Sequence, residues 1–228
     1  MNPSALTETD VLAFGRALSR LKQSGSTVLV TGSVPRAAFT AVSRQMLGDP
    51  GLSRRRLFVL TDATAESVDA RLPVAADPGQ TRIIEHCTFL RGATATANTT
   101  DGTHQYVYSD DLADLISATF EAIADLEVGA EPAELRVCID SLTPLVEYHG
   151  RKATFAALHA LCWRVRHARA LGHAYLQTDD PTEVELYTEL FDAHIELRDR
   201  AGTFQQRWHL RDENVTTDWL TLDAVEEG

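Results

Sequence analysis

Two hydrophobic runs in this sequence of 228 residues end in residues that could bind phosphate or a metal ion. The run Thr27–Thr31 is followed by Gly32-Ser33, and the run Leu135–Ile139 is followed by Asp140-Ser141. A glycine turn that opens a helix can hold a phosphate group with backbone N–H groups, and a carboxylate can bind Mg²⁺ beside a phosphate. These two strand ends are the first candidates for a functional site.

Each candidate also has a purely structural interpretation. Arg36 lies in the first turn of the helix predicted after Ser33, so its guanidinium group could contact phosphate. The alternative is that Ser33 only caps this helix and that Arg36 is a solvated charge. Asp140 could bind Mg²⁺ through water, or it could only form local hydrogen bonds with Ser141 or Thr143.

The elements that position these residues alternate between strand and helix. Residues 27–31, a helix to about residue 47 and residues 56–60 form a βαβ unit, which predicts parallel strands and a right-handed crossover. Further strands are predicted at 82–84, 135–140 and 174–176, and further helices at 8–22, 109–126, 151–171 and 182–190. Parallel strands present their working edge at their carboxyl ends, where both candidates lie.

The remaining segments complete a single α/β domain over residues 1–228. Residues 91–105 are small and polar without periodicity, which predicts a mobile loop, and Ser109 is the expected cap of the helix after it. Residues 193–197 and 204–210 predict an antiparallel hairpin added to a mainly parallel, twisted sheet between two layers of helices. The tail 223–228 is expected to be disordered.

The segment Val137-Cys138-Ile139-Asp140-Ser141-Leu142 resembles the Walker B segment of the RecA and KaiC-like branch of P-loop ATPases. The order of the elements after it (helix, strand, helix, closing hairpin) is similar as well. The resemblance implies a three-layer RecA/KaiC-type fold, with Asp62 as a loose counterpart of the family's catalytic acid. It also implies that RecA-like domains associate side by side, so self-association or pairing with an active relative is expected.

The phosphate loop departs from that family. A P-loop has the pattern G-x-x-x-x-G-K-[S/T], in which the lysine reaches the phosphates and the hydroxyl binds Mg²⁺. Gly32 takes the first position, but Ala37, Ala38 and Phe39 take the other three. This degenerate Walker A loop predicts that ATP hydrolysis is lost, with ATP and Mg²⁺ at most weakly bound. Phe39 is expected to enter the core.

Composition limits the function further. The net charge is −12, and Lys22 and Lys152 are the only lysines among the 21 basic residues. Such an acidic, lysine-poor chain is typical of proteins that work in very high salt, where like surface charges repel less, and the resembling proteins are those of salt-loving archaea. Nucleic acid is not an expected partner because no basic face is evident. The basic strip at Arg164, Arg166 and Arg169 is expected to pair with carboxylates.

The sequence shows no signal peptide, no membrane span and no metal-binding pattern, so a cytoplasmic protein is expected. Cys138 and Cys162 are predicted to be core residues. The favoured function is a non-catalytic, pseudo-ATPase regulatory or signalling module that acts through protein contacts. The alternatives are a weak ATP-binding protein or ATPase with an atypical phosphate loop, and a transcriptional regulator.

Overall fold

A computed structural model describes residues 8–49, 52–62, 66–72, 78–87, 99–212 and 215–222 of the chain. The helices are α1 (Glu8–Ser24), α2 (Arg36–Leu47), α3 (Glu66–Asp69), the 3-10 turn η1 (Pro78–Gln80), α4 (Leu112–Glu127), α5 (Thr143–His167) and α6 (Pro181–Thr188). The strands are β1 (Ser26–Thr31), β2 (Arg55–Leu60), β3 (Thr81–Cys87), β4 (Thr99–Asp101), β5 (His104–Tyr108), β6 (Leu135–Ile139), β7 (Leu171–Leu176), β8 (Ala193–Arg200), β9 (Thr203–Leu210), β10 (Val215–Thr216) and β11 (Leu220–Thr221).

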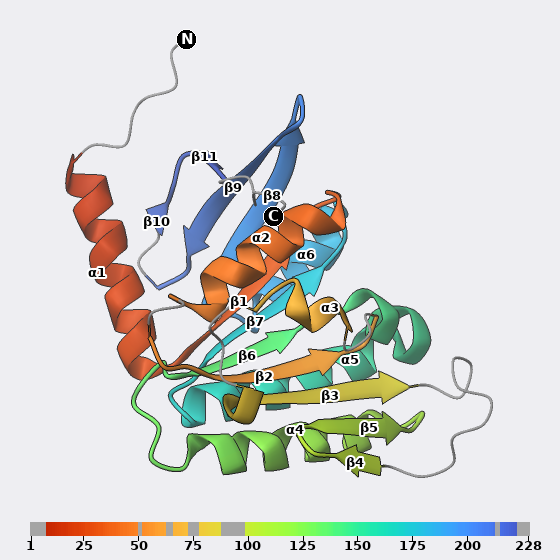
Figure 1. The fold of residues 1–228 in the computed structure, drawn as a ribbon. Helices are drawn as coiled ribbons and strands as arrows, with labels where there is room; N and C mark the ends of the chain where they lie inside the picture. The colour runs from red at the N-terminus through yellow and green to blue at the C-terminus, as the bar shows by residue number, and fades with distance from the viewer. Residues whose placement is uncertain are drawn as a thin grey trace.

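One mixed sheet runs through the molecule (Figure 1). Its order is β10-β9-β8-β1-β7-β6-β2-β3-β5-β4, and β11 pairs with β9 outside this path. The central strands from β8 to β5 pair in parallel, whereas β4 and the β8–β9 hairpin add antiparallel pairs at the two sides. All residues of β1, β6 and β7 are buried, which is why these strands appear as continuous hydrophobic runs. The predicted α/β class and the closing hairpin are confirmed.

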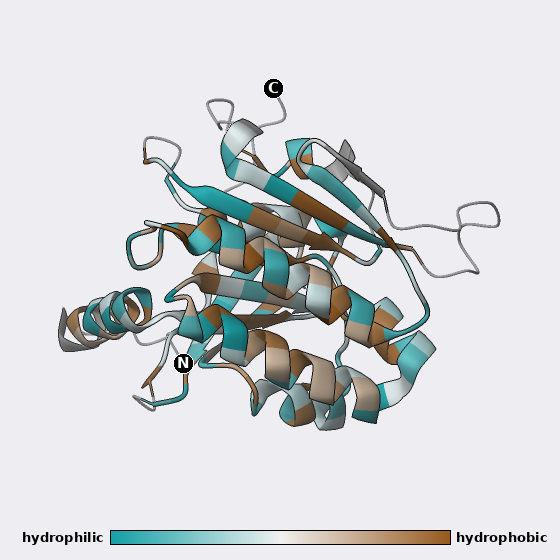
Figure 2. Cartoon of the chain, turned by 90° about the horizontal axis from the view of Figure 1, so that it is seen from below, coloured by the Kyte–Doolittle hydropathy of each residue, from teal (hydrophilic) through white to brown (hydrophobic). Residues whose placement is uncertain are grey.

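Helices cover both faces of the sheet, so the molecule has three layers (Figure 1). On one face, α1 and α2 bury alternate residues of β1 and β2 such as Val28, Val30 and Phe58. On the other face, α4, α5 and α6 bury the residues between them, such as Leu29 and Leu57. Figure 2 shows hydrophilic and hydrophobic residues alternating along the helices, as expected when one side of each helix is buried.

Two predicted boundaries on the carboxyl-terminal half are wrong. The helix predicted at 151–171 begins earlier than expected: α5 starts at Thr143, and Gly150 interrupts it with φ 78° and ψ 163°. Pro144 stands in the first turn, where proline is tolerated, and glycine adopts the left-handed conformation that divides the helix. The helix ends at His167, because the segment from Leu171 belongs to β7.

Gly172 directly follows the helix predicted at 151–171, but it lies inside β7. A Cβ atom there would lie 3.0 Å from the side chain of Val165 on α5, so glycine allows helix and strand to pack closely.

The loop predicted for residues 91–105 is also wrong in its second part. Residues 99–101 and 104–108 form the antiparallel pair β4–β5 around Gly102, whose φ is 57°; residues 91–98 lie outside the described residues. Ser109 is not the cap of α4. The N-cap is Asp111, whose carboxylate accepts a hydrogen bond from Ala113 N, while Ser109 Oγ accepts one from Asp111 N.

The predicted tail 223–228 also lies outside the described residues. The short strands β10 and β11 before it were not predicted, because two-residue strands carry no periodic signal. Cys138 and Cys162 are buried in the core as predicted. Within the described part of the chain, no helix is both long and apolar enough to cross a bilayer.

Candidate functional site

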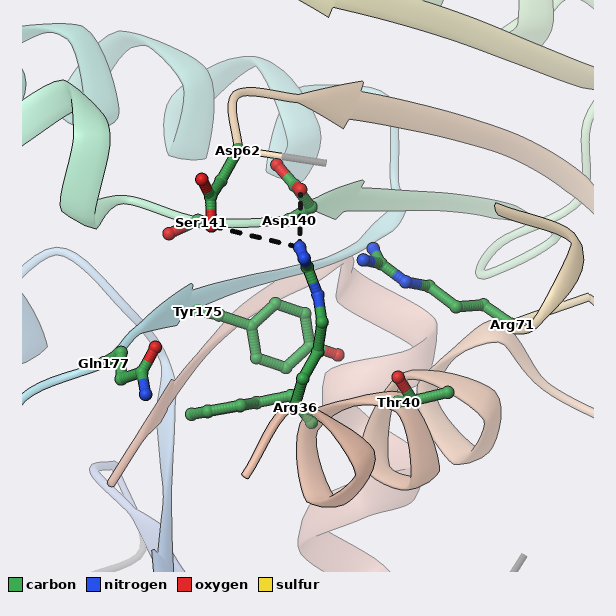
Figure 3. A pocket seen from close by; sticks show the side chains of 9 residues that line it. Arg36, Thr40, Asp62, Arg71, Asp140, Ser141, Tyr175 and Gln177 are labelled. Carbon is green, nitrogen blue, oxygen red and sulfur yellow. Dashed lines mark ion pairs between the residues drawn. The ribbon is translucent and has the colours of Figure 1, made fainter. Parts of the chain in front are cut away.

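A cavity of about 210 Å³ opens at the carboxyl ends of β2, β6 and β7, beside the first turns of α2 (Figure 3). Its nine lining residues come from five parts of the chain: Arg36, Phe39, Thr40, Asp62, Arg71, Asp140, Ser141, Tyr175 and Gln177. At this edge neighbouring strands are followed by helices on opposite faces of the sheet. The helix after β1 (α2) packs on one face, whereas the helices after β6 and β7 (α5 and α6) pack on the other. Ligands of open α/β sheets bind at such a position.

Asp140 is the most enclosed acid of this cavity. Its carboxylate is fully buried, and Oδ1 accepts a hydrogen bond of 2.6 Å from the backbone N–H of Thr61. The Thr61 hydroxyl lies 3.1 Å from the same oxygen and also donates to the carbonyl oxygen of Ser141. The carboxylate therefore ties the end of β6 to the end of β2.

Arg36 reaches across the cavity to this acid. Its Nη2 atom lies 3.6 Å from Asp140 Oδ2 and 4.0 Å from Asp62 Oδ2, as the dashed lines in Figure 3 show. Arg36 and Asp62 are about half exposed, so the contact with Asp62 is a weak surface pair. A guanidinium group thus faces the carboxylate oxygen that a hydrated Mg²⁺ ion would have to approach.

Gly32 and Ser33 do not line the cavity. Gly32 has φ 142°, and a Cβ atom at this position would lie 2.5 Å from the carbonyl oxygen of Leu197 on β8. The backbone N–H of Ser33 donates to Asp179 Oδ1 at 3.0 Å. This amide, which the sequence suggested for phosphate, therefore binds a carboxylate of the chain itself. Ser33 does not cap the helix either, because Pro35 is the N-cap of α2.

The residues at the last three P-loop positions belong to the helix. Ala38 is fully buried, and the Phe39 ring packs edge-on against Tyr175 with 5.2 Å between ring centroids. The prediction that Phe39 enters the core is confirmed. Within α2, neither residue provides a group that could bind phosphate oxygens or a metal ion.

The sequence model of the family of unknown function DUF7504 matches residues 25–197, about three quarters of the chain. The chain belongs to this family. The matched region begins just before β1 and ends in β8, so it contains the whole cavity but not α1 or β9. No curated protein matches the sequence.

Arg71, Tyr175 and Gln177 were not predicted as site residues in this DUF7504 chain. Arg71 is only 4% exposed, and its Nη1 atom donates to Cys138 Sγ at 3.7 Å. Figure 3 shows its guanidinium group directed toward the cavity. Arg71 follows a weakly periodic segment, which carried no signal for a buried cation. Tyr175 and Gln177 would have been found by treating the end of β7 like the ends of β1 and β6.

The buried polar residues beneath the cavity are held in fixed protonation states. Burial, together with the nearby charges of Arg71 and Arg136, lowers the pKa of His173 to about 3. Burial raises the pKa of the Cys138 thiol to about 11 and raises that of Tyr175 well above its usual range. These three groups are therefore neutral near pH 7. Among the described residues, no group of three or more His, Cys, Asp or Glu side chains could hold a metal ion.

The basic strip predicted at Arg164, Arg166 and Arg169 pairs with acids at two of its three positions. Arg164 makes two hydrogen bonds to Glu127, and Arg166 lies 3.3 Å from Asp192. These contacts agree with the predicted role of the arginines.

Proposed function

We propose that the protein is a non-catalytic, KaiC-like regulatory or signalling module that acts through protein contacts and has lost ATP hydrolysis. The observation that carries this proposal is the ion pair between Arg36 and the fully buried Asp140. In an ATPase that oxygen would face a hydrated Mg²⁺ ion. Here a side chain of the protein supplies the positive charge, and Thr61 donates to the other carboxylate oxygen.

The RecA/KaiC-type part of the proposal is supported by the arrangement of the elements. After β6 and Asp140 come α5, β7, α6 and the β8–β9 hairpin, in the order that the resemblance implies. The loop after β1 and the acid after β6 lie at the same edge of the sheet, on the two sides of β7.

The loss of catalysis is supported by the missing groups. Phosphoryl transfer needs a positive group beside the negative charge that develops on the phosphate, and a metal ion that holds the phosphate oxygens. Together they stabilise the transition state by several kcal/mol. The positions for that lysine and hydroxyl are occupied by Ala38 and Phe39, both buried. The cavity of about 210 Å³ is also smaller than the roughly 300–1,000 Å³ typical of pockets for small organic ligands.

A role in protein contacts is supported by an apolar group on the outer surface. Trp163 on α5 is 53% exposed and stacks on His167 with 5.1 Å between ring centroids. Tryptophan is enriched at protein interfaces, where it is often a main contributor to affinity.

Calorimetry with ATP and Mg²⁺ in molar KCl, together with a phosphate-release assay, tests the proposal. We expect neither micromolar binding nor turnover. Turnover that disappears in Asp140→Asn would show an active ATPase and would overturn the proposal. Micromolar binding without turnover would favour the weak ATP-binding alternative, with Arg36 and Arg71 as the groups that meet phosphate.

The regulatory half of the proposal needs a second measurement. Sedimentation velocity of the wild type and Trp163→Ser in molar KCl tests self-association. A wild-type dimer that dissociates more readily in Trp163→Ser would support contacts through α5. A sedimentation coefficient that stays that of a monomer at all concentrations would leave only a different protein as the partner.

A further inference from the structure

Three arginines gather at the edge of the sheet opposite the cavity, at the amino ends of β2 and β6. Arg54 directly precedes β2, and Arg56 and Arg136 are the second residues of β2 and β6. Arg56 and Arg136 are register partners in this parallel pair, so their side chains leave the sheet side by side on the face covered by α2. Like charges at directly neighbouring positions of a sheet are destabilising unless a further charge compensates them.

Two of these arginines are almost completely removed from water. Arg56 is 2% exposed and Arg136 is 5% exposed. A guanidinium group has five N–H donors, but Arg56 donates to the carbonyl oxygen of Arg54 at 3.1 Å and Arg136 to that of Met46 at 3.2 Å. The Nε atoms of Arg54, Arg56 and Arg136 are buried without a hydrogen-bond partner.

No carboxylate of the described residues forms an ion pair with these three arginines. The neighbouring Arg55 lies on the opposite face of the strand and pairs with Glu134. Burial and the charges of Arg54 and Arg56 lower the pKa of Arg136 to about 10, and burial and Arg54 lower that of Arg56. A buried charge of this kind is strongly unfavourable unless an opposite charge and hydrogen bonds accompany it.

Gly48, just after α2, shows where the guanidinium groups meet. A Cβ atom on Gly48 would lie 3.1 Å from Arg54 Nε and 3.5 Å from Arg136 Nη2. Both groups therefore converge on a point beside the end of α2 that lacks a side chain. The φ angle of Gly48 is 92°, which favours glycine at this position.

We propose that Arg54, Arg56 and Arg136 bind a small inorganic anion at this edge of the sheet. Chloride, sulfate and inorganic phosphate share the chemistry that the site requires, which is a compact negative charge that accepts several N–H bonds. The planar guanidinium group matches oxyanions best because two of its N–H groups can bind two oxygens at once. The anion would join α2 to β2 and β6, independently of the cavity and of the proposed function.

Thermal unfolding at constant ionic strength tests the proposal. The reference buffer is molar potassium gluconate, because gluconate is an organic anion too bulky for a site between buried side chains. Chloride, sulfate or phosphate then replaces part of the gluconate. We expect a saturating rise of the unfolding midpoint for at least one of the three anions, of about 5–10 °C at a hundredfold excess over Kd. The anion that acts at the lowest concentration identifies the preferred ligand, and equilibrium dialysis with labelled phosphate or sulfate measures one site per chain.

Variants separate the site from general salt effects. Arg54→Gln, whose side chain is the least buried of the three, should weaken the apparent affinity at least tenfold, and Arg136→Gln should abolish the response if it folds. Arg200→Gln makes the same change of charge at an exposed position and should keep the wild-type response. An unchanged response in Arg54→Gln, or no saturable rise in the wild type, would overturn the proposal.

Discussion

The carboxylate of Asp140 offers the sharpest test of the site, because the substitution Asp140→Asn changes its charge but hardly its shape. An asparagine oxygen can still accept the hydrogen bond of 2.6 Å from the Thr61 N–H. That bond changes from charge-assisted to neutral, however, and the ion pair with Arg36 is lost. If Asp140 serves the fold and not catalysis, the variant loses stability and nothing else.

The expected size of the loss follows from these two contacts. Hydrogen bonds to charged groups contribute about 1.5–3 kcal/mol and neutral ones about 0.5–1.5 kcal/mol, so the change costs about 1 kcal/mol. Arg36 is about half exposed, which limits the pair to about 0.2–1 kcal/mol. The sum is about 1–2 kcal/mol, which lowers the unfolding midpoint by about 2–8 °C for a chain of this length.

Urea unfolding followed by far-ultraviolet circular dichroism in molar KCl measures this loss. The matched control is Asp62→Asn, which removes the same charge from an acid that is 44% exposed and lies 4.0 Å from Arg36. We expect the control to stay within about 0.5 kcal/mol of the wild type. Wild-type stability in Asp140→Asn, or an equal loss in both variants, would refute the structural role assigned to the buried carboxylate.

Three further predictions concern other parts of the fold. Gly32→Ala should destabilise the protein by at least about 2 kcal/mol in urea, because its Cβ atom would lie 2.5 Å from a carbonyl oxygen. The control Gly202→Ala has open space around it and should cost no more than about 1–2 kcal/mol, which comes from its positive φ. His173 has a pKa of about 3 in the folded protein, below its unfolded value of about 6.5. Its contribution to stability is therefore complete above pH 6.5 and is lost as the pH falls. His173→Asn should reduce the loss of stability between pH 7.5 and pH 5 by about 2 kcal/mol. Glu127→Gln should cost at least about 1 kcal/mol in urea at pH 7. Glutamine keeps one acceptor oxygen, so one of the two bonds from the buried Arg164 is lost and the ion pair goes with it; an unchanged urea midpoint would show that this pair adds nothing.

The parallel sheet could be predicted because its central strands are buried on both faces and therefore appear as short β-branched runs. Because parallel strands have their carboxyl ends at the same edge of the sheet, acids at the ends of such runs could be assigned to that edge. Four of the six predicted site residues do line the cavity: Arg36, Asp62, Asp140 and Ser141. The exact limits of the helices were less predictable, since the division of α5 at Gly150 depends on packing between distant segments.

The two other site residues were misplaced for a specific physical reason. Gly32 and Ser33 were predicted to bind phosphate because they form a glycine turn after a buried strand. The direction of this turn is set by contacts with Leu197 and Asp179, more than 140 positions away. Arg71 was missed for a related reason. Its segment has no clear periodicity, so a buried arginine there could be recognised only from the contact with Cys138.

The distribution of charge connects the acidic composition to the site. A net charge of −12 belongs mostly to the surface, whereas Arg56, Arg71 and Arg136 are at most 5% exposed. Molar salt screens pairs of exposed charges within about 3 Å, so contacts such as that between Arg36 and Asp62 contribute little there. Charges removed from solvent are screened much less. The buried carboxylate of Asp140 and the buried arginines should therefore keep their effect at salt concentrations where surface pairs lose theirs, and stability in high salt should depend on these interior charges more than on the acidic surface.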